Sequence, residues 1–391
     1  MAVRHGYGKI AGTDALVFAY DTGDTVNSYK GEPTTNAFIG SSWDGDGANQ
    51  TFANKGAVTI TDPTYQYKNL PTALWTPGTS YNCYLNGIGD LNYSNTSTVW
   101  TFSCYIRRSD GGTLRASDNN LAVYLYYPNS DGTAIGTVQN MGNGWYRVWR
   151  TRTGSANYIA LAGFTGFAPG YKYYLSGWQL EKVSHPTPAL PINTTRSVTQ
   201  GLIDLKSTST VDLTNVSFDT NAQMIFDGTD DYVEIPNTNL PAPGLNYTLE
   251  CVFQRNSGRT IINYGPAFNG ASKYYNLEVP SSVLVANITT SIGSTQLVSS
   301  TTISSNIWYH GILTYNGSTV SLYINGVLAA SALTSGSILN TSTPSLNIGR
   351  KNSGNGEYIN GKVGLVKIYN RALTADEVRN NYSNYKTRFN L

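Results

Sequence analysis

The sequence predicts an all-β protein made of two β-sandwich or jelly-roll domains, with antiparallel sheets and one short C-terminal helix. Three observations predict this fold class. Tyrosine is abundant (29) and methionine scarce (3), and small polar residues separate short apolar runs, as in β-proteins with many tight turns. Apolar residues alternate strictly in stretches such as Val320, Leu322 and Ile324. Asn-Gly dipeptides flank this stretch, and Asn-Gly favours hairpin turns.

These features combine in residues 308–331, which we expect to form a three-stranded antiparallel meander. Asn316-Gly317 lies between the first two strands, and Asn325-Gly326 lies between the second and third. A two-residue hairpin turn needs positive φ at both central residues, which Asn and Gly tolerate. Each dipeptide therefore predicts a two-residue turn.

Further strands are expected wherever apolar residues alternate between turn-forming clusters. These strands are residues 15–20, 99–106, 121–126, 145–150, 158–164, 171–180, 248–254, 275–279, 346–349 and 362–369. Residues 107–112 should form a surface turn. One helix is expected near the C-terminus, because Thr374 and Glu377 have the spacing of a capping box, and it should end near Tyr382.

Turn-forming and proline-rich segments divide the chain into parts. Residues 30–36 read as a junction, and Pro186, Pro188 and Pro191 should end any strand pairing, because proline has no amide hydrogen to donate. We therefore expect a lead with a first strand at residues 1–35, a jelly roll at residues 36–196 and a sandwich at residues 197–391.

The charge balance argues against nucleic acid as a partner. The net charge is +2 and only 13% of residues are charged, so no basic surface of the kind that attracts phosphates is expected. No run approaches the roughly 18 apolar residues of a membrane span. The N-terminus lacks the basic and apolar regions of a secretory signal. We expect a protein made in a cytoplasm, with no membrane span.

The three cysteines do not have the spacing of a metal site. Cys104 and Cys251 alternate with apolar residues, which predicts buried free thiols. A Cys83–Cys104 disulfide is the alternative.

The second domain carries a series of short motifs from Phe226 to Glu377. They are Phe226-Asp227-Gly228, Thr248-Leu249-Glu250, Trp308-Tyr309-His310, Asn316-Gly317, Ile324-Asn325-Gly326, Leu346-Asn347-Ile348-Gly349 and Ile368-Tyr369-Asn370-Arg371-Ala372-Leu373. In this order they resemble the laminin-G-like branch of the concanavalin-A-type lectin/glucanase sandwiches. One departure is that Gly364-Leu365 stand where this family commonly has an Asp-Glu pair.

The first domain ends with Gly144-Trp145-Tyr146-Arg147-Val148 and Gly177-Trp178-Gln179-Leu180-Glu181. These motifs are similar to those of the carbohydrate-binding-module-like jelly rolls of phage tail and virion proteins. In phage versions of the laminin-G-like module, a strand resembling residues 16–21 precedes the Phe-Asp-Gly motif. The resemblance therefore implies that residues 10–35 belong to the C-terminal sandwich and that the jelly roll is inserted into it. Two domains in series are the alternative.

Catalysis is not expected, although the family that the second domain resembles includes glucanases. Those enzymes are similar to one another in a Glu-x-Asp-x-Glu strand, and none of the seven glutamates here has that spacing. His310 should be a packed structural residue. A hydrolytic site assembled from distant Asp residues is the alternative that sequence leaves open.

The acidic turn at Asp227, Asp230 and Asp231 is a candidate calcium site, because hard carboxylate oxygens on one loop suit calcium. The favoured alternative is that these side chains cap a tight turn. No other cofactor is expected.

Four tryptophans are candidates for stacking on sugar rings. They are Trp43, Trp75, Trp145 and Trp149. Trp43 and Trp75 lie in polar, turn-rich stretches. Trp145 and Trp149 share a strand face with Arg147, and a cation stacked between their rings explains that pattern equally well.

Together these features favour a non-enzymatic structural protein of a bacteriophage virion, as a tail fibre, tail or capsid-decoration component. Its expected partners are other virion proteins and host-surface glycans used for attachment, its expected location is the virion, and a homo-oligomer is expected. The alternative is a bacterial surface or secreted carbohydrate-binding protein.

Overall fold

The computed structural model describes most of the chain. The described residues are 15–37, 51–53, 57–59, 65–70, 72–76, 84–86, 98–114, 121–126, 137–153, 158–163, 172–191, 194–219, 221, 223–236, 240, 244–265, 275–339, 345–351 and 357–391. For 51–53, 57–59, 75–76, 84–86, 121–126 and 158–163 only the backbone is described.

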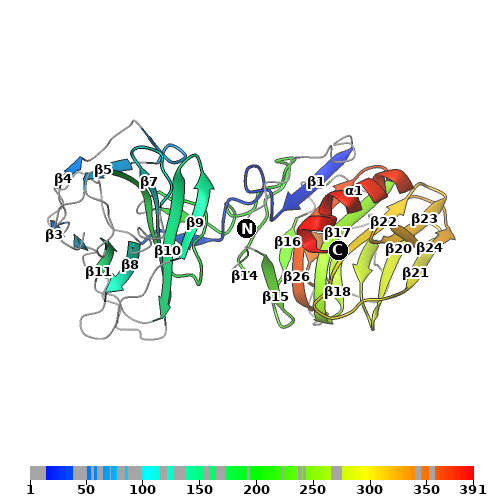
Figure 1. Ribbon diagram of the computed structural model, residues 1–391. Helices are drawn as coiled ribbons and strands as arrows, with labels where there is room; N and C mark the ends of the chain where they lie inside the picture. Colours follow the sequence, from blue (N-terminus) through cyan, green and yellow to red (C-terminus); the bar gives the residue numbers. More distant parts are fainter. Residues whose placement is uncertain are drawn as a thin grey trace. The chain divides into compact units, whose positions relative to one another are not determined.

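The chain divides into two compact units, each built from β-sheets (Figure 1). Unit 1 consists of Met1–Glu32 together with Val198–Leu391, and unit 2 consists of Pro33–Ser197. The first strand of unit 1, β1 (Leu16–Asp21), pairs antiparallel with the last strand, β26 (Ile359–Tyr369). The chain therefore starts one sheet of unit 1, forms unit 2, and returns to complete that sheet.

Unit 1 contains two antiparallel sheets. The eight-stranded sheet has the order β14 (Ser217–Phe218), β15 (Met224–Asp227), β26, β17 (Tyr247–Gly258), β22 (Trp308–Tyr315), β23 (Thr319–Ile324) and β24 (Val327–Leu333), with β1 also paired to β26. The six-stranded sheet has the order β16 (Val233–Ile235), β25 (Ser345–Ile348), β18 (Thr260–Gly265), β19 (Tyr275–Glu278), β20 (Val283–Thr290) and β21 (Gly293–Thr302).

Alternate side chains of both sheets pack into one continuous core. Each strand of a sandwich contributes every second residue to the space between the layers, because successive side chains point to opposite faces. Leu249 and Phe253 from the larger sheet and Ile262, Leu277 and Ile348 from the smaller sheet are all fully buried in this core. The predicted all-β sandwich architecture is confirmed.

The predicted meander is confirmed as β22, β23 and β24, but its two turns differ. Asn325 (φ 49°) and Gly326 (φ 79°) both have positive φ, as a two-residue hairpin turn requires. The first turn was expected to be the same, and this expectation is wrong: three residues separate Tyr315 from Thr319. There the Asn316 side chain accepts hydrogen bonds from the amides of two following residues, which favours the longer loop.

The C-terminal helix α1 (Ala375–Phe389) begins as predicted but runs seven residues beyond the expected end at Tyr382. Thr374 and Glu377 form the capping box in both directions. Tyr385 and Phe389 extend the helix, because both pack on Val252 and Leu365 of the eight-stranded sheet. The helix lies across the outer face of this sheet (Figure 1).

A buried polar cluster joins α1 to the sheet. Glu250 is fully buried and accepts hydrogen bonds from His310 Nε2 (2.9 Å) and Asn381 Nδ2 (2.9 Å). Burial alone would raise the pKa of Glu250, but Lys367 and the hydrogen bonds from His310 and Asn381 hold it below its ordinary value. His310 therefore has the structural place expected for it, away from solvent.

Unit 2 contains a six-stranded and a four-stranded sheet and one short two-stranded pair. The six-stranded sheet has the order β4 (Ala57–Thr59), β5 (Thr72–Thr76), β12 (Tyr173–Glu181), β7 (Val99–Arg108), β10 (Trp145–Thr153) and β9 (Thr137–Gly142). The others are β3 (Thr51–Ala53), β6 (Tyr84–Asn86), β11 (Tyr158–Gly163) and β8 (Leu121–Tyr126), and β13 (Thr195–Arg196) with β2 (Thr34–Thr35).

Two expectations for unit 2 need correction. The turn expected at residues 107–112 starts later, because β7 continues to Arg108 and pairs with β10 and β12 up to that end. Cys104 is a buried free thiol, so the alternative of a Cys83–Cys104 disulfide is wrong. Cys251 is also buried and free, and Cys83 lies outside the described residues. No described helix has both the length and the hydropathy needed to cross a membrane.

Candidate functional site

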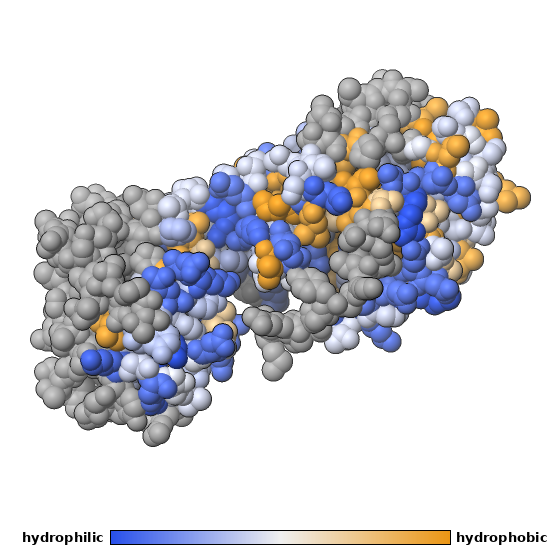
Figure 2. Space-filling view, turned by 90° about the horizontal axis from the view of Figure 1, so that it is seen from above, coloured by the Kyte–Doolittle hydropathy of each residue, from blue (hydrophilic) through white to orange (hydrophobic). Residues whose placement is uncertain are grey.

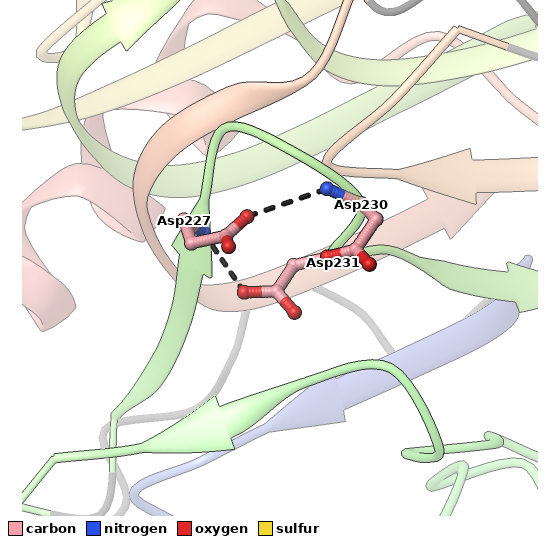
Figure 3. Close-up of side chains that lie close together, drawn as sticks. All are labelled: Asp227, Asp230 and Asp231. Carbon is pink, nitrogen blue, oxygen red and sulfur yellow. Dashed lines mark hydrogen bonds between the residues drawn. The ribbon is translucent and has the colours of Figure 1, made fainter.

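The predicted calcium candidates lie together in the turn between β15 and β16 (Figure 3). One carboxylate oxygen from each of Asp227, Asp230 and Asp231 lies within 4.8 Å of the others. The turn also uses these carboxylates: Asp227 Oδ1 accepts from the amides of Thr229 (2.7 Å) and Asp230 (3.3 Å), and Asp231 Oδ2 accepts from the Asp227 amide (2.8 Å). This is the turn-capping arrangement that the sequence favoured.

The two pKa directions in this turn follow from those contacts. The Thr229 amide and its neighbours lower the pKa of the exposed Asp227. Partial burial and then the charges of Asp227 and Asp230 raise the pKa of Asp231. Calcium binds six to eight oxygens, so an ion here would take the remaining carboxylate oxygens and several waters. Calcium binding at this turn stays a prediction.

The predicted tryptophans have different surroundings. Trp145 is buried, with its ring 5.7 Å from that of Tyr67, so it is part of an aromatic cluster. Trp149 is half-buried on β10. The backbone of Trp75 lies in β5, but its side chain and all of Trp43 lie outside what the structure describes. Arg147 stacks on Tyr105, with its guanidinium carbon 5.1 Å from the ring centre, and donates to Ser103 Oγ (3.0 Å).

A row of polar side chains crosses the six-stranded sheet of unit 1, and we call it the polar row. Directly paired residues on neighbouring strands point to the same face, so the strand register alone defines the row. It consists of Glu234, Asn347, Asn263, Asn276, Asn287 and Gln296, from β16, β25, β18, β19, β20 and β21 in that order. Five steps of about 4.8 Å give it a length on the order of 24 Å.

The polar row lies on the outer face of its sheet, because the residues on either side of its members point into the core. Ile262 and Tyr264 flank Asn263, and Tyr275 and Leu277 flank Asn276; all four are core residues. Asn263 (2% exposed) and Asn276 (0%) are nevertheless buried, whereas Gln296 at one end of the row is exposed. The row therefore runs from buried to open surface.

Three members of the polar row are hydrogen-bonded in series, and two others share a partner outside the row. Gln296 Nε2 donates to Asn287 Oδ1 (2.9 Å), and Asn287 Nδ2 donates to Asn276 Oδ1 (2.8 Å). At the other end, Arg350 donates to Asn347 Oδ1 (2.9 Å) and to Glu234 Oε2 (2.8 Å). These bonds fix the side chains from both ends of the row.

The chain of hydrogen bonds is interrupted in the middle. Asn263 and Asn276 are directly paired, yet Asn263 Oδ1 and Asn276 Nδ2 have no hydrogen-bond partner, and neither does Thr260 Oγ on the same face. Buried polar atoms are nearly always paired, and each unpaired one costs about 1–3 kcal/mol. One carbonyl oxygen, one amide nitrogen and one hydroxyl group on β18 and β19 are therefore held without a partner.

Charged groups flank this gap and neutralise one another. Arg259 Nε donates to the buried Glu278 (2.8 Å), and a second arm of Arg259 lies 3.4 Å from Glu357. The bond to Glu278 raises the pKa of Arg259, so the guanidinium stays charged. At the other end, Arg350 covers the ring of Tyr232, with its guanidinium carbon 3.3 Å from the ring centre.

Polar residues at alternate positions of these strands indicate the polar row in the sequence. A search for alternating apolar residues alone does not reveal it. The apolar members of residues 275–279 predict a strand, and the residues between them are Asn276 and Glu278. Asn263 and Asn347 occupy equivalent places between apolar neighbours in their own strands. Polar amides at the same alternate position in several strands predict a polar outer face, although only the register shows that they align.

Each of the seven glutamates interacts with another group of the chain. Glu32 is buried with an interaction of its own, and the other six have polar partners. These pairs are Glu181–Thr187, Glu234–Arg350, Glu250–His310, Glu278–Arg259, Glu357–Lys351 and Glu377–Arg371. Within the described residues, the acidic cluster that remains is the exposed turn in Figure 3.

Part of the chain matches the model of a known protein family. Residues 227–379 match the family described as the concanavalin A-like lectin/glucanases superfamily, which confirms the resemblance found in residues 226–377. No curated protein matches the chain.

Several solved structures are similar to the chain at low identity. The binding domain of Paraclostridial Mosquitocidal Protein 1 is 17% identical, with a TM-score of 0.40 over 47% of this chain and 49% of that one. The botulinum neurotoxin serotype D binding domain is 16% identical, with a TM-score of 0.38 over 48% and 49%. The chain spans about half the length of these two structures. Domain 4 of AbnA, an extracellular arabinanase from Geobacillus stearothermophilus, solved with arabinotriose, is 17% identical, with a TM-score of 0.33 over 41% and 76%.

Proposed function

We propose that this chain is a non-enzymatic, glycan-binding structural protein of a bacteriophage virion, and that the polar row of unit 1 is its sugar-binding surface. The observation that carries the glycan proposal is the unpaired acceptor of Asn263 beside the unpaired donor of Asn276. A hydroxyl group that reached these buried atoms would satisfy both at once, because it donates one hydrogen bond and accepts others. Sugars present many hydroxyl groups in fixed positions.

The other members of the row suit the same ligand. Amide side chains such as Asn287 and Gln296 offer both donors and acceptors without a net charge, which matches neutral hydroxyl groups. The charges near the row are already paired, as in Arg259 with Glu278 and Arg350 with Glu234. A neutral or weakly charged glycan therefore fits this face better than a polyanion.

The proposal that the chain binds rather than cleaves glycans rests on its carboxylates. A glycosidase needs two carboxyl groups facing across the scissile bond, with one kept protonated. Six of the seven glutamates are held by cations or a hydroxyl group, and Glu32 is buried with an interaction of its own. The acidic turn is exposed and its carboxylates bind the backbone of the turn itself.

The location on a virion is supported by the resemblance of residues 144–181 and 16–21 to phage modules. In that setting the two units would contact other virion proteins on one side and glycans of the host surface on another. This part of the proposal is separate from the sugar chemistry, so it has its own test.

The direct experiment is a microarray of bacterial surface polysaccharides probed with the full-length chain. We expect binding to at least one neutral glycan, and a loss of at least tenfold in affinity for the double variant Asn263→Leu/Asn276→Leu. Asn384→Leu, the same change at an exposed position of α1, is the control. Binding that the double variant leaves unchanged would remove the polar row from the proposal, and release of new reducing ends would contradict a non-enzymatic role. Mass spectrometry of purified virions should detect the chain; its presence only in the soluble lysate would contradict the virion location.

A further inference from the structure

A long segment of unit 1 is free of charged side chains. Residues 279–349 contain no Asp, Glu, Lys or Arg, although 13% of the whole chain is charged. This segment includes β20 to β25. Charged side chains on the surface usually keep a protein soluble and oppose its association with other copies. Their absence over six consecutive strands therefore needs a physical reason.

Two strands of this segment form an edge of unit 1. β21 is the last strand of the six-stranded sheet and β24 is the last strand of the eight-stranded sheet, and the two lie side by side (Figure 1). We call this side of unit 1 the β21–β24 edge. The strands at the opposite ends of the two sheets, β14 and β16, have only two and three residues. The long edges of both sheets thus meet in one place.

The β21–β24 edge lacks most of the devices that protect edge strands. Such strands usually carry lysine, an inward-pointing charge or proline, or they are very short. β21 and β24 contain no charged residue and no proline. One bulge interrupts the pairing of β24 with β23 near Leu328, and beyond it the pairing continues regularly from Ala330 to Leu333.

Large apolar side chains are exposed at the same edge. Val327 is 69% exposed, Leu328 52% and Leu333 85% on β24, and Val298 on β21 is 52% exposed. Figure 2 shows hydrophobic residues at the right-hand end of the molecule, where Figure 1 places β21 and β24. Exposed apolar residues on uncharged edge strands are typical of protein–protein contact surfaces.

We infer that the β21–β24 edge binds a second copy of this chain around a two-fold axis. In such an interface the same surface appears on both sides and must be complementary to itself. An uncharged surface meets this condition, because two copies bring no like charges together and bury no unpaired charge. A two-fold axis also sets edge strands of the two copies antiparallel, which is the orientation in which strands pair.

A partner of different chemistry fits this edge less well. An acidic or basic protein would bury its charges against a surface that has none to pair with them, which is costly. A three-fold arrangement would need two different complementary surfaces on each copy. The inference depends on the charge pattern and exposure of unit 1, and it is independent of the proposed glycan binding.

Sedimentation velocity of the full-length chain over a range of concentrations tests this inference. We expect a dimer, and we expect Val327→Lys and Leu333→Glu each to weaken it at least tenfold, because each puts a charge without a partner into an uncharged interface. An equimolar mixture of the two variants should dimerise again, since in an antiparallel pair the first residue of one β24 faces the last residue of the other, so Lys then faces Glu.

The matched control is Val26→Lys, because Val26 in unit 1 has the same 69% exposure but lies in the turn after β1. This variant should remain dimeric, and circular dichroism should show that all three variants are folded. A wild-type monomer at every concentration, a trimer, or a dimer that Val327→Lys does not weaken would each overturn the inference.

Discussion

Asn263 shows how a single buried polar residue can reduce stability. Its amide oxygen is buried without a hydrogen-bond partner, on a strand whose neighbouring residues are core residues. An apolar side chain of similar size would avoid this cost. Binding sites commonly keep such unfavourable groups, because the ligand supplies the missing partner.

This view predicts opposite effects for the same substitution at two positions of the polar row. Asn263→Leu should raise the free energy of unfolding by about 1 kcal/mol, because it removes an unpaired buried carbonyl oxygen. Asn347→Leu should lower it by about 1–3 kcal/mol, because Asn347 is bonded to Ser345 and Arg350. Urea unfolding of both variants beside the wild type measures the difference. Equal destabilisation by the two would show that Asn263 is a structural residue.

Gly364 explains at the same scale why the acidic pair of related sequences is absent here. A Cβ at this position would lie 2.6 Å from the Phe389 ring of α1. The adjacent Leu365 contacts the same end of the helix. Gly364 therefore leaves room for the Phe389 ring, and Leu365 packs against the same end of α1. Two carboxylate side chains at these positions would provide neither the space nor the apolar contact.

The helix α1 depends on ionic contacts at its start and apolar contacts at its end. Glu377 bonds the amide of the N-cap residue Thr374 (2.9 Å) and both arms of the Arg371 guanidinium (2.7 Å each). The bond from Arg371, against a smaller opposing effect of burial, lowers the pKa of Glu377 from 4.5 to about 2. The folded state therefore binds the ionised form of Glu377 more strongly than the unfolded chain does.

The sign of the pH dependence follows from this lowered pKa. The stabilisation by Glu377 is complete above pH 4.5 and is lost as the pH falls towards 2, because protonation then removes the charge that Arg371 binds. Since both side chains are partly exposed, we expect Glu377→Gln to cost about 1–2 kcal/mol at pH 7 and much less at pH 3. Calorimetric unfolding at both pH values measures this.

Asp376→Asn is the matched control, because Asp376 lies in the same helical turn but its ion pair with Arg379 is exposed. It should change stability by less than about 0.5 kcal/mol at either pH. A loss for Glu377→Gln that is the same at pH 7 and pH 3 would show that shape, and not charge, holds the start of the helix.

Elements with strong local signals were predictable, and those defined by distant contacts were not. Alternating residues and Asn-Gly turns predicted the meander, and the capping box predicted where α1 begins. The end of α1 was placed too early, because Tyr385 and Phe389 extend it through contacts with strands distant in sequence. The polar row was missed for the same reason, since its members align only through the register of six strands.

At the scale of the whole molecule, the chain has two β-units and a candidate ligand surface in each. Unit 2 offers aromatic residues, of which Trp149 stays half-buried while Trp145 is enclosed by other rings. Unit 1 offers the polar row with its unpaired amides. We propose the sugar site on unit 1, because only there do described buried groups combine an unpaired donor and an unpaired acceptor on directly paired residues.

Hydrogen–deuterium exchange of the full-length chain, with and without a glycan that the array identifies, tests this placement most directly. Bound sugar should slow amide exchange in residues 260–265, 275–278 and 283–290, which are the strands that carry the middle of the polar row. Slower exchange confined to residues 99–108 and 145–153 of unit 2, with these three strands unchanged, would contradict the account.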